Sequence, residues 1–550
     1  MSRRTYDLVV VGGGITGACV ARDAALRGLS VALVDKGDFG HATTAASSKL
    51  IHGGLRYLRY LQFGVVRDSL HERRVWANTA PHLIEPMTFL VPTFDARAYR
   101  RMELAAALTA YDLLSFDRNR LLDPDKHIGR HRVYSREQAI AIEPALESTR
   151  LSGAMTFTDY QMYSPERLSL ECVLDAVTHG ADVANYAEVK RFLVEERRVH
   201  GVEVADGLRG GAMHTLRGRM VVNACGAWAD MYLGELGSTR QPRRLIRSKG
   251  IHLLTRPLTR SHGLGIQTDK AHFFIIPWRG HSLIGTTDTL FQGNPDECRV
   301  LEQDIADFLA IVNEALPGLG LGRADVQYFY AGLRPIVDME AKPGKDEGGT
   351  YEASRAAEVY DHEAHDGLAG GITAIGGKWT TSRSLARKVV DLAFRRMGRK
   401  PPPCTTDVTP THGGATGPFE PFVREALARH AGQPAGLVQH LARNYGTRMD
   451  ALLELAGQQP DWAAPLAQGY MDIGAQVAHA VREEMAVTLD DVLFRRTGLG
   501  TLGYPGDAGM ERVSGILAGL LDWDAEERRA QVEGAMARYA AAQGSTPSDG

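Results

Sequence analysis

The sequence predicts a chain of mixed class, in which an α/β domain is interleaved with a sheet-based α+β domain and followed by a helical C-terminal domain. Three observations indicate this arrangement. A buried strand near the N-terminus leads into a glycine turn and a helix, short strands dominate the second quarter, and apolar residues recur at helical spacing after residue 405. A length of 550 residues exceeds one ordinary domain, so several units are expected.

Composition excludes several classes of protein. With 44% hydrophobic residues, 23% charged residues and a net charge of -3, the chain resembles neither a disordered protein nor a general nucleic-acid-binding protein. Its five cysteines lie far apart and form no CxxC pair, so we expect neither a disulfide framework nor a metal site. This pattern favours a reducing, cytoplasmic compartment. We expect no membrane span, because the sequence has no apolar run of about 18 residues.

The N-terminal strand "DLVVV" leads into "GGGITG", in which Gly12, Gly14 and Gly17 fit the pattern G-x-G-x-x-G. In such a turn the first glycine permits the tight bend, the second lets the backbone approach a pyrophosphate, and the third lets the helix pack on the strand. The helix that begins near Thr16 would point the positive end of its dipole at the phosphates.

A second strand, "SVALVDK", ends at Asp35 and Lys36. Asp35 lies 23 residues beyond Gly12 and can accept hydrogen bonds from an adenosine ribose. The alternative is an ordinary strand–turn–helix unit with a surface aspartate, which the agreement of strand, turn, helix and acid disfavours. The pattern predicts a Rossmann-like site for an ADP-containing cofactor, either FAD or NAD.

The middle of the chain reads as strands and one helix inserted into this nucleotide-binding core. The predicted strands cover 200–206, 219–226, 272–278 and 281–288, and the helix covers 300–316. A polar break follows at 344–355. The proline run "RKPPPC" at 399–404 is the predicted domain boundary, with helices at 440–456 and 515–543 and a frayed tail at 544–550.

Many ordered motifs then point to one family. They are "VVGGGITGACVARDAALRGLSVALVDKGD", "TTAASSKLIHGGLRYL", "APHLIEPMTFLVP", "VVNACGAW", "LIGTTDT", "AGLRPIV", "IGGKWTTSRSLA" and, near the C-terminus, "EEMAVTLDDVLFRRT". The chain resembles the D-amino-acid-oxidase-like flavoproteins and, within them, the FAD-dependent, quinone-reducing glycerol-3-phosphate dehydrogenases. It departs mildly, with "ACG" where Ala-Thr-Gly is common and serine where "KWTTSR" often ends in tyrosine.

This resemblance implies an FAD-binding domain over 1–400, interleaved with substrate-domain insertions at roughly 76–160 and 241–354, and a helical domain over 401–550. The adenosine end of FAD is expected at the glycine turn, Asp35 and Lys36. Small hydroxyl groups and open amides can hydrogen-bond the flavin edge, although a single Ser or Thr is more often a loop cap. The residues implied for the flavin end are Thr43, Thr44, Ser47, Ser48, Lys49, Leu50, Ala224, Gly226, Gly377, Lys378, Thr380 and Thr381.

A phosphorylated polyol substrate requires convergent cationic groups. The resemblance implies that four cationic residues lie near the flavin: Arg56, Arg334, Arg355 and Lys378. Tyr57 could add a hydrogen bond to the phosphate or the hydroxyl group of the substrate. Oxidation of a secondary alcohol also needs a base. His252 is the predicted base, with His52 as the second candidate, and Arg334 is expected to act in catalysis as well as in binding. Cationic neighbours would lower the pKa of His252 and keep it neutral.

The electron acceptor is the least determined part. Within 95–132 a set of arginines flanks an apolar segment, a pattern that suits an anionic membrane surface and equally an amphipathic helix packed on the protein: Arg97, Arg100, Arg101, Arg118, Arg120, Arg130 and Arg132 surround Leu104, Leu108, Leu113, Leu114 and Phe116. With the resemblance, it predicts a peripheral protein on the cytoplasmic face of the membrane that reduces a quinone.

The predicted activity is therefore oxidation of sn-glycerol 3-phosphate to dihydroxyacetone phosphate, with electrons passing through FAD to quinone. Three alternatives stay open: an oxidase that releases hydrogen peroxide, a dehydrogenase of another 2-hydroxy compound whose carboxylate would occupy the cationic site, and a non-catalytic flavin-binding module. Nucleic acid is not expected as a partner, and a homodimer is one assembly the resemblance allows.

Overall fold

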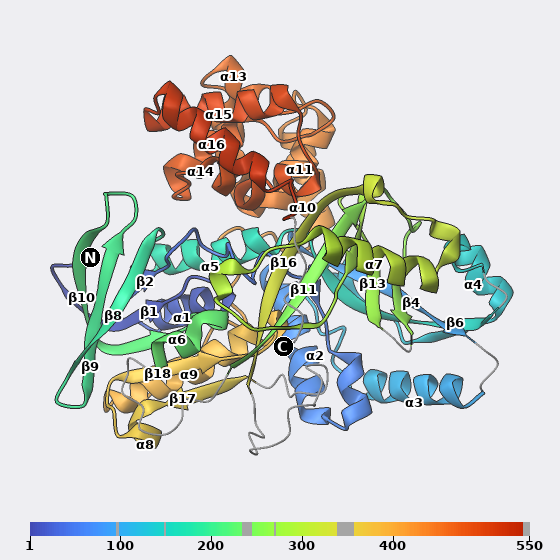
Figure 1. Ribbon diagram of the computed structural model, residues 1–550, viewed down its shortest axis with the longest axis horizontal. Helices are drawn as coiled ribbons and strands as arrows, with labels where there is room; N and C mark the ends of the chain where they lie inside the picture. Colours follow the sequence, from blue (N-terminus) through green and yellow to red (C-terminus); the bar gives the residue numbers. More distant parts are fainter. Residues whose placement is uncertain (95–97, 148–149, 234–244, 269–270, 338–356, 543–550) are drawn as a thin grey trace.

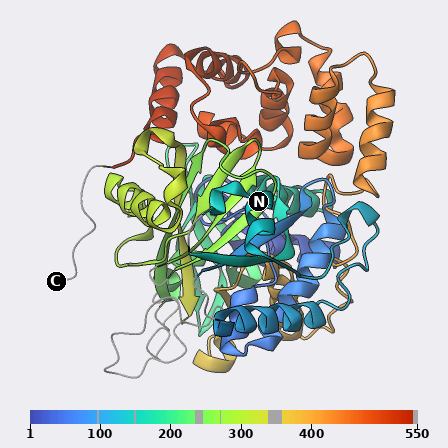
Figure 2. The same cartoon turned by 90° about the vertical axis from the view of Figure 1, so that its right-hand side faces the viewer.

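The computed structural model describes residues 1–94, 98–147, 150–233, 245–268, 271–337 and 357–542. Two sheets with their helices lie side by side, and a helical domain sits above them (Figures 1 and 2). The predicted mixed fold class is thereby confirmed. The polar break at 344–355, the tail at 544–550, Arg97 and Arg355 lie outside the described residues, and so does the side chain of Arg100.

The first sheet has the strand order β17-β18-β10-β1-β2-β7, and β8 and β9 extend it from β10. Pairing is parallel from β18 to β7, as expected for a Rossmann-like core. Its strands are β1 (Thr5–Val11), β2 (Val31–Val34), β7 (Asp182–Ala184), β8 (Ala187–Glu195), β9 (Arg198–Asp206), β10 (Ala212–Asn223), β17 (Glu358–Asp361) and β18 (Gly371–Ile375).

Helix α1 (Ile15–Leu26) packs against α5 (Pro165–Thr178) and α9 (Ser382–Arg396) to cover one face of this sheet. Its sequence "ITGACVARDAAL" combines helix-forming alanines with small side chains, which allows close packing between two other helices. Apolar residues of β8 and β9 pack on the other face. Two short helices, α6 (Ala229–Leu233) and α8 (His362–Asp366), lie at its connections.

The second sheet is mostly antiparallel and has the order β15-β11-β14-β13-β12-β4-β6-β3, with β16 on β11 and β5 on β6. Chain segments on both sides of β10 build it, so the two sheets are interleaved as predicted. Its strands are β3 (Leu50–Ile51), β4 (Ile84–Phe94), β5 (Arg132–Tyr134), β6 (Leu151–Met162), β11 (Leu245–Thr255), β12 (Gly263–Gln267), β13 (His272–Trp278), β14 (His281–Gly285), β15 (Thr289–Phe291) and β16 (Val326–Val337).

Helices on the second sheet form two apolar clusters. Helix α7 (Glu302–Ala315) buries Ile305, Phe308 and Val312 against one of them, with α4 (Arg136–Ile142) beside it. Helices α2 (Phe63–Thr79) and α3 (Ala98–Leu114) contribute to the other, where Leu108 is fully buried. In the apolar segment predicted for a membrane, Leu104, Leu108 and Leu114 pack in this second cluster, whereas Leu113 and Phe116 are 72% and 70% exposed.

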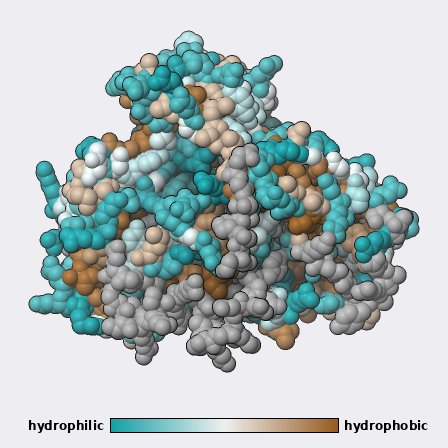
Figure 3. Space-filling view, in the orientation of Figure 1, coloured by the Kyte–Doolittle hydropathy of each residue, from teal (hydrophilic) through white to brown (hydrophobic). Residues whose placement is uncertain are grey.

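The C-terminal domain is helical, as the spacing predicts, and its face in Figure 3 is largely hydrophilic. Part of it forms its own core, and part packs on the second sheet against Leu254, Trp278 and Tyr328. Its helices are α10 (Phe419–Arg429), α11 (Ala435–Tyr445), α12 (Met449–Ala456), α13 (Pro460–Ala463), α14 (Gly474–Glu483), the π-helical segment Asp491–Arg496, α15 (Asp507–Leu521) and α16 (Ala525–Ala537).

The connection after the proline run is held to α1 by two buried arginines. Arg22 donates hydrogen bonds to the carbonyl oxygens of Thr409 and Pro410 at 2.8 and 3.0 Å. Arg27 donates to the carbonyl oxygen of Pro402 at 3.2 Å. The segment that contains the predicted boundary is thus hydrogen-bonded to helix α1 and to the residue that follows it. Among the described residues, no helix is both long and apolar enough to cross a membrane.

Candidate active site

A cavity of about 1360 Å³ runs from the glycine turn to the second sheet. Both sheets line it, so it lies at the junction that the interleaved topology creates. The predicted residues that line it are Gly12, Gly14, Thr16, Asp35, Lys36, Thr43, Thr44, Ser47, Ser48, Leu50, His52, Arg56, Ala224, Gly226, His252, Arg334, Gly377 and Lys378. Gly17, Lys49, Tyr57, Thr380 and Thr381 do not line it, and Arg355 lies outside the described residues.

At one end of the cavity the glycines act as the pattern requires. Gly12 has φ +100°, and a Cβ there would lie 2.7 Å from the carbonyl oxygen of Ala224. A Cβ on Gly17 would lie 1.8 Å from the carbonyl oxygen of Gly12, so this glycine lets α1 approach the turn rather than lining the cavity. No other residue fits either position without moving the backbone.

Asp35 follows β2 and holds the turn together. Its carboxylate accepts the backbone N–H of Gly13 at 2.6 Å and that of Gly37 at 2.9 Å. Burial raises its pKa, and His41 and these N–H groups oppose that shift. The residue lines the cavity as predicted, and it also organises the backbone that surrounds it.

Thr44 caps the nucleotide-binding helix from a distant loop. Its hydroxyl accepts the N–H of Ile15, the first residue of α1, at 3.0 Å. A hydroxyl acceptor at the first turn satisfies one of the amides that the helix itself leaves unpaired. The predicted flavin-end residue therefore also supports the phosphate end of the site.

The middle of the cavity has small residues and left-handed glycines. Gly226 and Gly377 have φ +55° and +94°, and a Cβ at Gly226 would meet no atom within 4 Å. The Thr43 hydroxyl donates to the carbonyl oxygen of Leu333 at 2.7 Å. Backbone approaches of this kind leave room for a flat ring system, so the residues present fit the flavin that the sequence predicts.

The side chain of Lys49 does not line the cavity, although the sequence predicted it at the flavin end. It is 1% exposed, and its ammonium group pairs with Glu166 at 2.5 Å instead of facing the cavity. Burial lowers the pKa of Lys49, and the Glu166 carboxylate opposes that change. Thr380 is also buried, and its hydroxyl accepts the backbone N–H of His52 at 3.2 Å. Both residues support the cavity wall from behind.

His252 lies on β11 at the cavity and is 2% exposed. Its Nε2 is hydrogen-bonded to the hydroxyl of Ser48 at 2.9 Å, and its ring stacks on Tyr330 with centroids 4.9 Å apart. Burial, with smaller contributions from the charges of Arg334 and Lys49, lowers its pKa well below the usual value. The ring is therefore neutral at neutral pH, and among the described residues Nδ1 has no hydrogen-bond partner.

Arg334 reaches the cavity from β16 across Gly250. Its guanidinium group donates to the Ser248 hydroxyl at 3.0 Å and to the Thr286 hydroxyl at 2.6 Å. A Cβ on Gly250 would lie 2.1 Å from this guanidinium group, so the glycine leaves room for it. Asp288 lies 4.0 Å away and balances part of its charge. The arginine is held in one orientation by several partners.

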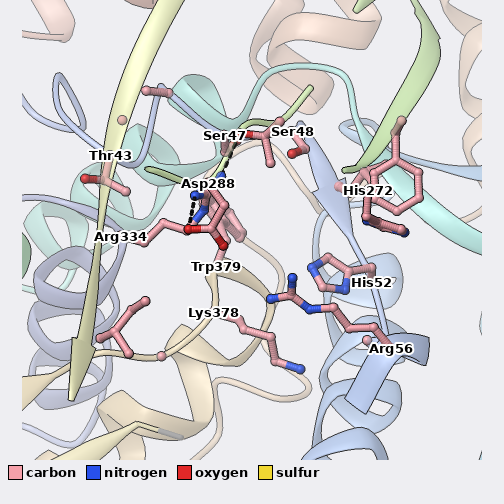
Figure 4. Close-up of a pocket in the computed structure, with 18 of the residues that line it drawn as sticks. Thr43, Ser47, Ser48, His52, Arg56, His272, Asp288, Arg334, Lys378 and Trp379 are labelled. Atoms are coloured by element: carbon pink, nitrogen blue, oxygen red, sulfur yellow. Dashed lines mark hydrogen bonds and ion pairs between the residues drawn. The ribbon is translucent and has the colours of Figure 1, made fainter. Parts of the chain in front are cut away.

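Arg56 and Lys378 supply positive charge from two different parts of the chain. Arg56 donates to the hydroxyl of Tyr57 at 3.0 Å, and Lys378 lies 4.6 Å from the centroid of the same ring. Lys378 also donates to the hydroxyl of Ser69. Figure 4 shows Arg56, Lys378 and His52 on the same side of the pocket. Tyr57 is buried and contacts both cations.

The cavity is also lined by residues that the sequence analysis did not single out. They are His272 at the start of β13, Asp288 after β14, and Trp379 beside Lys378 (Figure 4). His272 contacts Phe274 edge to face at 4.9 Å, and burial, followed by the charge of Arg56, lowers its pKa to about 4. Asp288 and Trp379 lie in the motifs "LIGTTDT" and "IGGKWTTSRSLA". His272 lies in the predicted strand "HFFIIPW", whose alternation does not say which face meets a cavity.

Comparison with known proteins decides the family. The model for FAD dependent oxidoreductases matches residues 7–392, and that for the C-terminal domain of alpha-glycerophosphate oxidase matches residues 404–528. A glycerol-3-phosphate dehydrogenase of a Synechocystis species is 35% identical over 96% of this chain and 95% of its own. The chain belongs to the FAD-dependent oxidoreductases, in their glycerol-3-phosphate dehydrogenase group. FAD is accordingly its cofactor.

Other members of the group agree along the whole chain. Glycerol-3-phosphate dehydrogenase 2 of Mycobacterium tuberculosis is 34% identical over 98% of this chain and 88% of its own. The crystal structure of the glycerol-3-phosphate dehydrogenase from Bacillus halodurans complexed with FAD has a TM-score of 0.77 and 28% identity, and the match covers 98% of this chain and 95% of that one. The predicted cofactor and family are confirmed.

Proposed function

We propose that this flavoprotein oxidises sn-glycerol 3-phosphate to dihydroxyacetone phosphate. The observation that carries the proposal is the cavity itself, which begins at the glycine turn and ends among Arg56, Arg334, Lys378 and His252. Related proteins named glycerol-3-phosphate dehydrogenase extend over almost the whole chain and support the same substrate. When bound, FAD supplies the acceptor for the hydride that leaves the substrate carbon.

The roles of the side chains follow from their charges and contacts. Arg56 and Lys378 are proposed to bind the phosphate dianion through charge-assisted hydrogen bonds. Arg334, held by Ser248 and Thr286, would orient the oxygen atoms at the reacting carbon. His252 is neutral and fixed by Ser48, so it can accept the proton of the hydroxyl group.

Anaerobic mixing tests the substrate. The yellow holoenzyme should lose its flavin colour with glycerol 3-phosphate and keep it with glycerol, which lacks the dianion. Lactate tests the alternative of a 2-hydroxy acid dehydrogenase, because a carboxylate would then occupy the cationic site. Loss of colour with lactate alone would replace the proposal with that alternative, and no loss with any of them would favour a non-catalytic flavin-binding module.

We further propose a membrane quinone as the electron acceptor. The cavity extends to Tyr60, Leu61 and Phe63, which lie just before and at the start of α2, and Leu61 is 72% exposed. Phe116, after the end of α3, is 70% exposed. Both α2 and α3 contact the short helix that contains Tyr60, so these apolar side chains lie on neighbouring elements beside an opening to the cavity. An apolar opening suits an apolar acceptor and the surface of a bilayer.

This part of the proposal places the protein peripherally on the cytoplasmic face of the membrane. Cosedimentation with anionic vesicles should fall when Leu61 and Phe63 are both changed to Ser, while anaerobic flavin reduction stays unchanged. Hydrogen peroxide formed in equal amount to product, with no rate gain from a quinone analogue, would identify an oxidase instead. The homodimer expected from sequence stays a prediction.

A further inference from the structure

We propose that the C-terminal domain holds the adenosine-binding loop of the FAD site in place, and that Arg495 and Arg496 are positioning residues for FAD binding. The loop in question covers residues 35–41, between β2 and the segment that carries Thr43. Its contact with the C-terminal domain is made through Asp38. The inference depends on FAD binding and not on which substrate is oxidised.

Asp38 is the centre of a buried ionic contact between the two domains. Its carboxylate accepts hydrogen bonds from Arg495 Nε at 2.6 Å and from Arg496 Nη1 and Nη2 at 2.7 and 2.8 Å. The Arg496 pair is bidentate, which fixes direction as well as distance. Asn185 donates a further bond at 3.1 Å. The side chains of Asp38 and Arg496 have no exposed surface, and that of Arg495 is 6% exposed.

The loop transmits the position of Asp38 to the cofactor-binding residues. Asp35 accepts the N–H of Gly37, and the carbonyl oxygen of Gly37 accepts the N–H of Tyr186 at 3.0 Å. Asp35 also binds Gly13 in the glycine turn. A movement of Asp38 would therefore move the carboxylate at the ribose end and the backbone at the phosphate end. Asp38 itself does not line the cavity, so its role is indirect.

The arginines are fixed just as firmly on the C-terminal side. Asp491 accepts a bond from Arg495 Nη2 at 2.5 Å and one from the Tyr186 hydroxyl at 2.6 Å. Arg496 also donates to the carbonyl oxygen of Glu484 at 2.8 Å. The π-helical segment is thus hydrogen-bonded to the first domain at Asp38 and at Tyr186. This is the segment "TLDDVLFRRT", whose arginines do not line the cavity.

The charge state of the contact is stable. Burial opposes ionisation of Asp38, but the neighbouring Arg496 and Arg495 outweigh it and hold the pKa of Asp38 below its usual value. Removing one partner of a buried ion pair leaves an uncompensated charge and is strongly destabilising. The mildest substitution is Arg495→Gln, because Asp38 keeps its bidentate bond to Arg496 and Asp491 keeps its bond to Tyr186.

The test measures FAD affinity rather than turnover. Apoprotein of Arg495→Gln and of Asp38→Asn is titrated with FAD, and the quenching of flavin fluorescence gives Kd. We expect Kd to rise about 5- to 150-fold, the range usual for coupling between distant sites. Arg495→Lys, which keeps the charge and one bond, should recover part of the affinity. Urea unfolding of each apoprotein gives the accompanying loss of stability.

Arg443→Gln is the matched control. Arg443 also joins the two domains, at Glu85 and at the carbonyl oxygen of His82, but it does not touch the loop. Its FAD Kd should stay within about twofold of the wild type, well below the range expected from coupling. Unchanged affinity in folded Arg495→Gln, or an equal loss of affinity in Arg443→Gln, would overturn the proposal.

If neither Arg495→Gln nor Asp38→Asn folds, hydrogen exchange of the wild-type holoenzyme tests whether the C-terminal domain holds the loop. The amides of residues 35–41 should exchange together with those of residues 484–497 as urea is raised, because the contact couples their opening. Independent exchange of the two segments would show that the C-terminal domain does not hold the loop.

Discussion

Replacing His252 with Asn removes the imidazole and leaves a side chain that cannot act as a base. His252 is 2% exposed and is fixed between the Ser48 hydroxyl and the ring of Tyr330. Proton transfer by a positioned base typically contributes about 10²- to 10⁴-fold to a rate. The rate of anaerobic flavin reduction should fall by that factor, which corresponds to about 3 to 5 kcal/mol in the activation free energy.

Gly285→Ala perturbs the same ring without removing it. His252 and Gly285 are paired on β11 and β14, and a Cβ on Gly285 would lie 2.0 Å from His252 Cδ2 and 2.6 Å from Nε2. The strand backbone is held by its pairing, so the ring must move and the 2.9 Å contact with Ser48 must lengthen. We expect flavin reduction to slow in the same direction as in His252→Asn, and by a smaller factor.

Stopped-flow absorbance at saturating glycerol 3-phosphate measures this step directly. FAD content and melting temperature are checked for each variant, and His281→Asn, on the same strand β14 and off the cavity wall, is the control. Flavin reduction at the wild-type rate in both His252→Asn and His252→Ala would refute the assignment. A loss confined to variants with reduced FAD content would refute it as well, since it would report cofactor binding instead.

Three further outcomes follow from the cavity. Gly12→Ala should yield protein without FAD, because its Cβ would lie 2.7 Å from the Ala224 carbonyl oxygen at φ +100°; a normal flavin spectrum would contradict this. Lys378→Met should raise the KM for glycerol 3-phosphate about tenfold or more, as expected for a lost charged hydrogen bond, and an unchanged KM would place the phosphate elsewhere. Burial lowers the pKa of His272 from 6.5 to about 4. Between these two pH values the unfolded chain therefore binds a proton at His272 that the folded chain does not bind, which favours unfolding. The melting temperature should therefore fall as pH drops from 6.5 toward 4, and less steeply in His272→Asn; parallel curves would refute the assignment.

The sequence predicts the phosphate end of the site because the glycine pattern follows from the strand–turn–helix unit itself. Gly17 lets the helix approach Gly12, five residues earlier, and Gly12 lets the turn approach Ala224, which follows the paired strand β10. The cationic end was predictable only through the motifs around Arg56 and Lys378. Their convergence on Tyr57 depends on tertiary packing, which periodicity and spacing do not encode.

Lys49 and His272 mark the limit of such prediction. Lys49 stands in a segment that lines the cavity, yet its positive φ of 58° turns it toward Glu166 on α5. His272 begins an apolar strand. Phe274, which its ring contacts, lies two residues further along the same strand, but Arg56, whose charge helps to lower its pKa, lies just before α2. Lys49 and His272 each have a charged partner that is distant in sequence, so the role of the side chain appears only in the fold.

The two carboxylates of the loop after β2, Asp35 and Asp38, have different roles at the cofactor site. Asp35 faces the cavity, but its oxygen atoms already bind the backbone of Gly13 and Gly37, so it shapes the turn as well as offering an acceptor to the ribose. Asp38 faces away and binds Arg495, 457 positions later in the chain. Within the loop, the backbone N–H and the Nδ1 of His41 contact the carbonyl oxygen of Asp38, and Phe39 packs in the core of the first sheet. The buried pairing of Asp38 with Arg495 adds a contact from outside this domain, which gives the helical domain a physical role at a flavin site that it does not line.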